Sequence, residues 1–217
     1  MWPFRRRISL NASGLFDGFV DWHSHILPGV DDGVQTLDEA LAILSLYERY
    51  GVAEVWLTPH VMEDIPNTTA GLRARFDELV AAYEGSIRLH LWSENMLDNL
   101  FEERLAADDL LTADENRVLV ETSYFNPPMG LYDTLQRLCS KGYTPVLAHP
   151  ERYMYMGYDD YRRLKEEGVE LQLNVPSLAG MYGNHVRNKA EWLKRNGFYD
   201  CMGTDVHNIH MAERFFE

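Results

Sequence analysis

The stretch DWHSHILPGVDDG at residues 21–33 follows a short apolar run and places His23 and His25 two positions apart. In an extended strand, side chains two residues apart point to the same face, so both imidazoles can reach one ion. The chain then turns and delivers two adjacent carboxylates, Asp31 and Asp32. Two imidazoles and a carboxylate are suitable ligands for Zn²⁺, Mn²⁺ or Fe. This stretch therefore predicts a strand that ends in a metal site.

Length and composition indicate one domain that is not built to bind nucleic acid. The chain has 217 residues, of which 46% are hydrophobic, so it can bury a sizeable core. No apolar run is long enough to cross a bilayer, and we expect no transmembrane segment. The formal net charge of −14 would repel phosphate backbones, which argues against nucleic acid as a partner.

The start of the chain is basic, with three consecutive arginines at residues 5–7, but no apolar segment of the secretory type follows. We expect residues 1–17 to form a solvated N-terminal tail and residues 18–217 to form a single domain. The chain has only two cysteines, which predicts no disulfide framework and fits a reducing cytoplasm. The predicted location is therefore cytoplasmic.

Short apolar runs alternate with helical patterns along the whole domain. This rhythm is typical of βαβ units with parallel strand pairing. The capping-box pattern at Thr36–Glu39 marks the start of the first helix. Helices are expected near residues 37–50, 69–83, 97–107, 131–141, 158–167 and 184–196. Seven strands are expected at residues 19–22, 53–58, 87–92, 117–120, 144–148, 170–174 and 199–203.

Ligand-type side chains follow six of these seven strands. They are His23 with His25, His60, Glu94, Glu121, His149, and Asp205 with His207. In a parallel barrel, catalytic groups sit at the carboxyl ends of the strands. An apolar core explains the strands but not a polar residue after nearly every one. The pattern therefore predicts one cluster.

With Asp32 the cluster has nine groups, which is too many for one tetrahedral ion and suits two or three ions. Asp32 is preferred as the ligand because it precedes the permissive Gly33, and Asp31 is the alternative. We expect His23 and His25 to share one ion and Asp32 to serve another.

Other histidines have simpler interpretations. His90 lies between leucines inside the third strand and is expected to be packed or hydrogen-bonded. His185 and His210 are expected at the surface.

Neither cysteine fits a cysteine-based phosphatase, which needs an arginine six positions after the nucleophile. Pro145 stands six positions after Cys139, and His207 stands six positions after Cys201. Both thiols are therefore expected to pack in the protein.

One arginine stands out by its position. Arg152 follows His149 by three residues, so it leaves the same strand end near the predicted metals. Guanidinium groups bind phosphate oxygens in a bidentate manner. The alternative is a surface salt bridge with Glu151 or Asp159.

The combined motifs resemble the PHP (polymerase and histidinol phosphatase) superfamily, and within it the bacterial capsule-biosynthesis tyrosine-protein phosphatases. The motifs are D-x-H-x-H at 21–25, VDDG at 30–33, TPH at 58–60, Glu94, ETS at 121–123, AHPERY at 148–153 and GTDVHN at 203–208. The resemblance runs from about residue 18 to the end. Two departures concern the rim of the site: the residues flanking Glu94 differ from the family pattern, and the last helix is expected to be short.

The resemblance implies an α/β fold, a distorted TIM-like (β/α)7 barrel with outer helices, the PHP fold. It implies two or three divalent ions, manganese first and Fe, Zn, Co or Mg as alternatives. By motif position the ligands would be His23, His25, Asp32, His60, Glu94, Glu121, His149, Asp205 and His207, and Arg152 would bind the substrate phosphate. The implied substrate is a phosphotyrosine protein, a bacterial tyrosine kinase tail that controls capsular or exopolysaccharide biosynthesis. Oligomeric state is left open, a homo-oligomer included.

The mechanism expected from these residues uses a water or hydroxide that bridges two ions and attacks phosphorus in line. The ions and Arg152 would stabilise the equatorial oxygens, and His207 is a candidate proton donor. A phenolate leaving group, whose conjugate acid has a pKa of about 10, needs little help from an acid. The alternatives are a phosphatase of a small metabolite (histidinol phosphate or a sugar phosphate), an amidohydrolase-like metal hydrolase, and a barrel that only binds.

Overall fold

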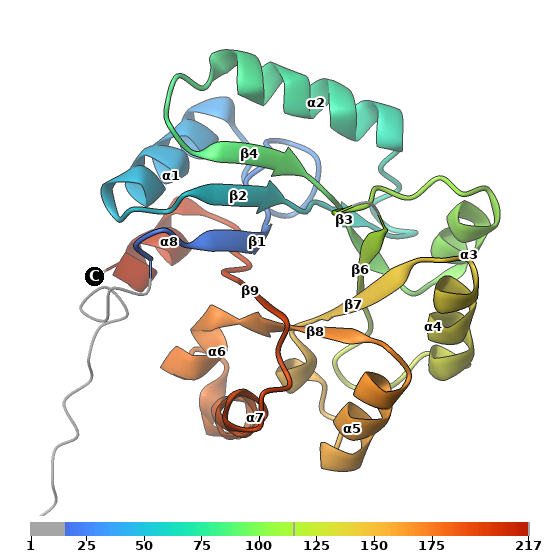
Figure 1. Ribbon diagram of the computed structural model, residues 1–217. Coiled ribbons are helices and arrows are strands. Elements are labelled where there is room, and N and C mark those ends of the chain that lie inside the picture. Colours follow the sequence, from blue (N-terminus) through green and yellow to red (C-terminus); the bar gives the residue numbers. More distant parts are fainter. Residues whose placement is uncertain (1–15, 115, 217) are drawn as a thin grey trace, which may run out of the picture.

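The computed structural model describes residues 16–114 and 116–216 and shows an α/β fold with parallel strands (Figure 1). The strands are β1 (Val20–Ser24), β2 (Glu54–Leu57), β3 (His60–Val61), β4 (Arg88–Leu91), β5 (Glu94–Met96), β6 (Arg117–Glu121), β7 (Thr144–Ala148), β8 (Glu170–Asn174) and β9 (Cys201–Gly203). They form a three-stranded sheet of order β1-β2-β4 and a six-stranded sheet of order β3-β5-β6-β7-β8-β9. The predicted parallel α/β class is confirmed.

Two of the predicted strands are each followed by a short strand that was not predicted. The strand predicted at 53–58 is β2, and β3 follows it after Pro59, which has no N–H to donate to a ladder. The strand predicted at 87–92 becomes β4 and is followed by β5. Main-chain bonds continue across both breaks: Trp92 N donates to Leu57 O at 2.8 Å, and Glu94 N donates to Pro59 O at 3.1 Å. These breaks bend the chain where it reaches the site.

The two sheets meet where the first strand lies beside the last. His25 N donates to Val206 O at 2.9 Å, and Asp205 N donates to His23 O at 2.8 Å. Gly203 allows this approach, because a Cβ there would lie 2.3 Å from the Cβ of His23. The segment that opens the metal motif is thereby held against the segment that closes it.

Helices pack on the outside of the curled sheets (Figure 1). They are α1 (Leu37–Arg49), α2 (Thr69–Ala82), α3 (Asn99–Ala106), α4 (Leu131–Ser140), α5 (Tyr158–Glu166), α6 (Val175–Ala179), α7 (Gly183–Arg195), α8 (Ile209–Phe216) and the 3-10 turn η2 (Pro150–Arg152). At the start of α1, Thr36 Oγ1 accepts a bond from Glu39 N, but the Glu39 carboxylate accepts from Ile209 N of α8. The predicted capping box is thus half formed. No helix within the described residues is long and apolar enough to cross a membrane.

The start of the described chain packs into the core. Phe16 is buried, and its ring centroid lies 4.7 Å from that of Phe216 on α8 and 5.3 Å from that of Phe19. Residues 1–15 of the predicted N-terminal tail, including the basic run, lie outside the described residues. The strand interiors supply most of the remaining core, so the polar residues at their carboxyl ends are set on a rigid scaffold.

Candidate metal centre and active site

The nine predicted ligands converge in the folded chain. Seven of them belong to three overlapping groups, and within each group the ligand atoms lie within 4.8 Å of one another. The groups are His23 with His25 and Glu94; His25 with Asp32, His60 and His207; and His60 with Glu94 and Glu121. His149 and Asp205 join through Glu94 and the paired imidazoles. The predicted single cluster is present as a geometric feature.

The paired histidines at the end of β1 meet two carboxylates from other parts of the chain. The Nε2 atoms of His23 and His25 lie 3.1 Å apart. Glu94 Oε2 is 3.2 Å from the first and 3.3 Å from the second, and Asp205 Oδ1 is 3.5 and 3.4 Å away. Two imidazole nitrogens and two carboxylate oxygens thus face one small volume.

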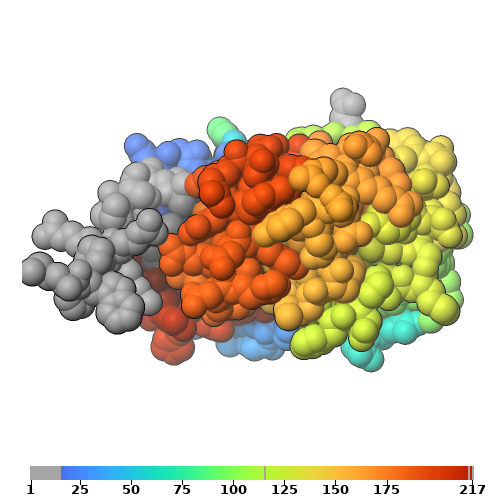
Figure 2. Space-filling model, turned by 90° about the horizontal axis from the view of Figure 1, so that it is seen from below, coloured from blue at the N-terminus to red at the C-terminus, as the bar shows by residue number. Residues whose placement is uncertain are grey.

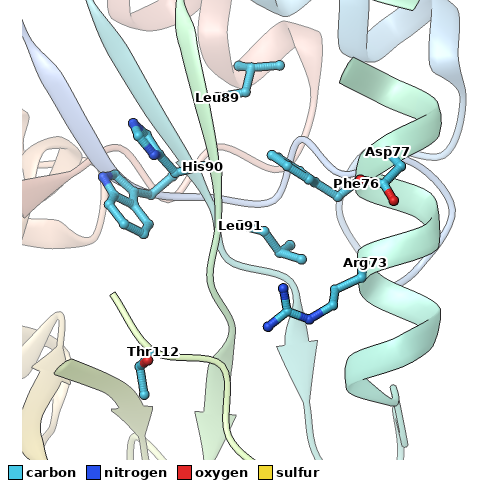
Figure 3. Close-up of a pocket in the computed structure, with 8 residues that line it drawn as sticks. Arg73, Phe76, Asp77, Leu89, His90, Leu91 and Thr112 are labelled. Atoms are coloured by element: carbon cyan, nitrogen blue, oxygen red, sulfur yellow. The ribbon is translucent and has the colours of Figure 1, made fainter. Parts of the chain in front are cut away.

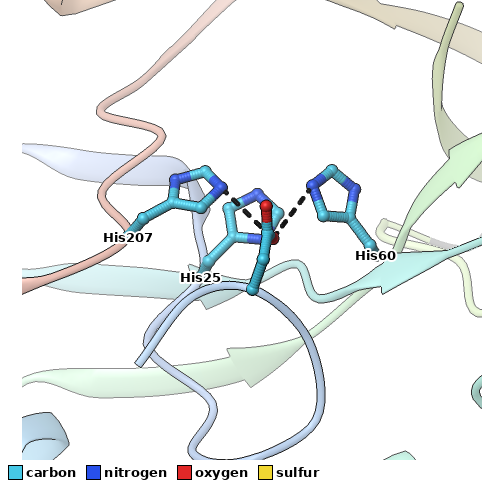
Figure 4. A group of neighbouring side chains, drawn as sticks. His25, His60 and His207 are labelled. Carbon is cyan, nitrogen blue, oxygen red and sulfur yellow. Dashed lines mark ion pairs between the residues drawn. The ribbon is translucent and has the colours of Figure 1, made fainter. Parts of the chain in front are cut away.

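Asp32 faces a second volume, as its predicted separate role requires. Its Oδ1 lies 3.6 Å from His60 Nε2 and 3.7 Å from His207 Nε2. Figure 4 shows the rings of His25, His60 and His207 gathered around this point. His25 belongs to this group and to the first one. The segment at residues 21–33 therefore contributes ligands to both volumes.

Asp31, the alternative ligand, has a different task. Its Oδ2 accepts a bond from His25 Nδ1 at 2.8 Å and one from His60 N at 3.0 Å, and its Oδ1 accepts from Gly33 N at 2.9 Å. These bonds direct His25 Nε2 toward the centre. Metal-binding imidazoles are usually oriented by such a partner.

A third volume lies between His60 and the carboxylates of β5 and β6. His60 Nδ1 is 3.2 Å from Glu94 Oε2 and 3.1 Å from Glu121 Oε1. His149 Nε2 approaches the other oxygen of Glu94 at 2.8 Å and Glu121 Oε2 at 3.8 Å. Glu94 therefore stands between volumes, in the position of a bridging carboxylate.

Two amides of β8 support the cluster and were not predicted. Gln172 Oε1 accepts from His23 Nδ1 at 2.6 Å, and its amide nitrogen donates to Trp22 O, which fixes its orientation. Asn174 Nδ2 donates to Asp205 Oδ2 at 3.0 Å. The sequence carried a signal for Asn174, because β8 is the predicted strand that ends in an amide instead of a His, Asp or Glu, and Gln172 lies two residues before it.

The site concentrates negative charge in a buried place. Burial opposes the imidazolium form of His25, but its bonds to Asp205, Asp31 and Glu94 raise its pKa well above the usual value. Burial also works against ionised Asp205, yet the neighbouring His23 and His25 hold its pKa far below the usual range. The site thus favours a cation among its ionised carboxylates.

The side chains present fit divalent ions. The donor set mixes imidazole nitrogens with carboxylate oxygens, as Mn²⁺, Fe and Zn²⁺ accept. His60 Nδ1 and Glu94 Oε2 are buried and have no hydrogen-bond partner among the described residues. Such atoms are costly to bury unless something binds them. Both point into the shared volume, which suits ions held there.

Two of these residues have unusual backbone angles. His149 follows β7 with φ 36°, and Asp205 follows β9 with φ 55°. Left-handed angles are uncommon outside glycine and cluster at functional sites. The chain turns sharply at each strand end and directs these side chains back over the cluster.

Arg152 lies in the predicted place beside the centre. Its Nη1 donates to Asp205 Oδ2 at 2.7 Å. Its guanidinium carbon lies 4.4 Å from the ring centroid of Tyr124 and 4.3 Å from that of Tyr182. Two aromatic faces and one carboxylate hold the plane of the group. The ion pair of Arg152 is formed with Asp205. The predicted alternative, a surface salt bridge with Glu151 or Asp159, is not found among the described residues.

The cluster lies at the floor of an open cleft of about 540 Å³. Arg152 and seven predicted ligands line it together with an apolar wall of Met62, Met96, Tyr124 and Phe125. The polar floor suits a phosphate group, and the apolar wall suits an aryl group attached to it.

The remaining histidines lie as predicted, and Cys201 is buried in the core as predicted, whereas Cys139 is only partly buried. His90 Nε2 donates to Glu54 Oε2 at 2.9 Å, and its ring stacks on Trp56 beside a separate hollow between β4 and α2 (Figure 3). His185 and His210 are exposed. Burial raises the pKa of the Cys201 thiol to about 11, so it is a poor nucleophile.

The chain matches the family described as "Capsular polysaccharide synthesis, CpsB/CapC" over residues 19–214. The chain belongs to this family. It is 28% identical over 197 residues to the tyrosine-protein phosphatase YwqE of Bacillus subtilis, covering 88% of this chain and 78% of the relative. It is 26% identical over 210 residues to the tyrosine-protein phosphatase CpsB of Streptococcus pneumoniae, covering 88% and 83%.

A solved structure gives a matching fold with a TM-score of 0.81 at 26% identity, covering 89% of this chain and 81% of the other. It comes from work on YwqE of Bacillus subtilis and CpsB of Streptococcus pneumoniae as unique metal-dependent tyrosine phosphatases. The family predicted from the motifs is confirmed, and so is the predicted enzyme class.

Proposed function

We propose that this protein is a metal-dependent protein-tyrosine phosphatase that acts in capsular or exopolysaccharide biosynthesis. The observation that supports this most is the cleft: it combines a buried set of metal-type ligands with one clamped arginine and an aryl-sized apolar wall. The names of the relatives point the same way. We include in the proposal manganese in two or three sites, a tyrosine kinase tail as substrate and a cytoplasmic location.

The residues of the cleft have separable tasks in this proposal. Ions held by the nine ligands would supply positive charge and an activated water. Arg152 would bind two phosphate oxygens with the guanidinium edge that its bond to Asp205 leaves open. Tyr124 would hold Arg152 in plane on one side of the cleft. The phenolate product needs no strong acid, because its conjugate acid has a pKa of about 10.

His207 has two candidate tasks, and the contacts support one of them. Its Nδ1 donates to Asp205 O at 2.9 Å if the ring is neutral, which leaves the Nε2 lone pair directed at the volume shared with Asp32. Burial and the nearby His25 lower its pKa, so the neutral ring is favoured. We therefore propose a ligand role. The proton-donor role stays a prediction without support from these contacts.

We also propose that the strands form one distorted (β/α)7 barrel. Counting β2 with β3, and β4 with β5, as single bent strands gives seven, and the main-chain bonds from His23 and His25 to residues 205–206 join its ends. The domain would span residues 18–217.

The experiment that tests the proposed substrate compares a phosphotyrosine peptide with histidinol phosphate and a sugar phosphate under the same metal conditions. We expect the peptide to have the highest kcat/KM. Much faster turnover of histidinol phosphate would favour the small-metabolite phosphatase instead.

A further inference from the structure

The loop between β6 and α4, residues 122–130, has two faces. Residues 122–125 line the catalytic cleft, while Pro127, Pro128 and Gly130 line a second groove of about 450 Å³. One short segment is thus the wall that separates the cleft from the groove. Whatever leaves the cleft on this side must cross this loop.

Apolar side chains are exposed along this wall. Phe125 is 73% exposed, Met129 is fully exposed, and the nearby Met154 is 55% exposed. Exposed large apolar side chains that gather in one place mark binding surfaces more often than scattered ones do. These three are half of the six exposed large hydrophobic residues in the described parts of the chain.

The loop is held in place by its neighbours. Met154 N donates to Tyr124 O at 2.7 Å, and the hydroxyls of Thr122 and Tyr155 lie 2.5 Å apart. In Figure 2 the yellow-green atoms of the loop region adjoin the amber atoms of the residues near 150. Phe125 and Met129 are therefore exposed on a segment that hydrogen bonds hold in place.

The groove behind the loop suits an extended chain with apolar side chains. Its apolar walls include Pro127, Pro128, Tyr132, Tyr155 and Met156. Three charged side chains, those of Asp133, Asp160 and Arg163, also line it, and the Arg163 guanidinium lies 3.5 Å from the Tyr132 ring centroid. Aromatic and proline walls offer apolar area at little entropic cost, as in other grooves that bind extended peptides.

We infer that the surface formed by the 122–130 loop and this groove binds the polypeptide that flanks the substrate phosphotyrosine. The inference rests on the proposed function. A phosphotyrosine whose phosphate reaches Arg152 places its ring along Tyr124 and Phe125, and its main chain then leaves the cleft over the loop. The occupant is an extended segment of the substrate with an apolar side chain within a few residues of the phosphotyrosine.

The test uses two aryl phosphate monoesters, of which only one carries a polypeptide. One is p-nitrophenyl phosphate, and the other is a phosphotyrosine peptide with leucines on both sides. The variants are Met129→Ala and Met154→Ala, because both side chains are exposed and neither lines the catalytic cleft. Val80→Ala is the matched control, because Val80 is also exposed (44%) but lies on α2. We expect each methionine variant to lower kcat/KM for the peptide about tenfold, through KM, with p-nitrophenyl phosphate unchanged.

A peptide with serines in place of the leucines should lose the difference between wild type and the methionine variants. Equal losses on both substrates, or no loss on either, would overturn the docking surface. Affinity for the same peptides carrying a non-hydrolysable phosphonate gives a readout that does not depend on turnover. If wild type hydrolyses neither substrate, the proposed function fails, while a leucine-dependent affinity lost in Met129→Ala would still support the surface.

Discussion

Asp31 and Asp32 are adjacent in the sequence but have different surroundings. The side chain of Asp31 is enclosed and accepts bonds from His25, His60 and Gly33, whereas the side chain of Asp32 is 66% exposed and faces two imidazoles across the cleft. The sequence could indicate a carboxylate at this turn, but only the fold of the turn shows which one orients a ring and which one faces the centre.

The support of His23 by Gln172 predicts a measurable effect on metal binding. Replacing Gln172 by Leu removes the acceptor from His23 Nδ1 and leaves the ring free to change tautomer. Loss of such a supporting partner typically costs 10- to 100-fold in metal affinity. We expect this loss for Gln172→Leu in Mn²⁺ titration calorimetry. Gln172→Glu keeps an acceptor and should lose much less, and equal losses would contradict the role.

Arg152 should not be replaceable by lysine. The guanidinium plane is held between Tyr124 and Tyr182, and an ammonium group cannot form the same forked bonds. One charge-assisted bond contributes about 1.5–3 kcal/mol, so Arg152→Lys should lower kcat/KM roughly 10- to 100-fold. Steady-state kinetics on a phosphotyrosine peptide measures it. Activity within twofold of wild type would exclude a direct phosphate contact.

Asp21 gives a pH-dependent stability with a defined sign. Burial raises its pKa from 3.8 to about 6, so the folded state binds the proton more tightly than the unfolded state. Its contribution to stability is therefore present at low pH and falls as pH rises from about 4 to about 6, by about 3 kcal/mol in total.

Asp21→Asn removes this titration. The free energy of unfolding of wild type, measured by urea titration relative to Asp21→Asn, should fall by about 3 kcal/mol between pH 4 and pH 7. A constant difference across this range would show that Asp21 is not the titrating group.

At the scale of elements, much of the fold is readable from the sequence. Alternation of apolar runs with helical patterns predicts the order of strands and helices, and α5 begins at the predicted residue. The helices α6 and η2 were not predicted, because each is very short and contains a proline near its start. The strand breaks after β2 and β4 could not be predicted from hydrophobic periodicity either, because they depend on where the sheet bends.

The candidate site was predictable to the extent that it lies at strand ends. Parallel strands bring their carboxyl ends to one edge, so the nine ligand types could be placed together. The clamp of Tyr124 and Tyr182 on Arg152 could not, because these residues lie in loops whose course depends on the whole fold.

The junction of β1 with β9 is sensitive to one methyl group. A Cβ at Gly203 would lie 2.3 Å from the Cβ of His23 and 2.9 Å from its nitrogen, so β9 would have to move away from β1. Overpacking of this kind costs about 1–3 kcal/mol. Gly203→Ala should lower stability by this amount in thermal unfolding and also weaken metal binding. Gly157→Ala, where a Cβ meets no atom closer than 3.7 Å, should change neither.

At the scale of the whole molecule, the cluster takes ligands from most strands of both sheets and from the loops after them. An ion bound there connects the first strand with the last. Binding to the folded state alone stabilises it by about 2.7 kcal/mol at a concentration of 100 Kd. The net charge of −14 adds to this preference for cations.

The most direct test of the account is a phosphatase assay after complete chelation and metal add-back, with phosphotyrosine and phosphoserine peptides side by side. We predict that chelation abolishes hydrolysis of the phosphotyrosine peptide, that Mn²⁺ restores it, and that the phosphoserine peptide is the poorer substrate when Mn²⁺ is present. Hydrolysis of the phosphotyrosine peptide that survives complete chelation would contradict the metal-dependent mechanism.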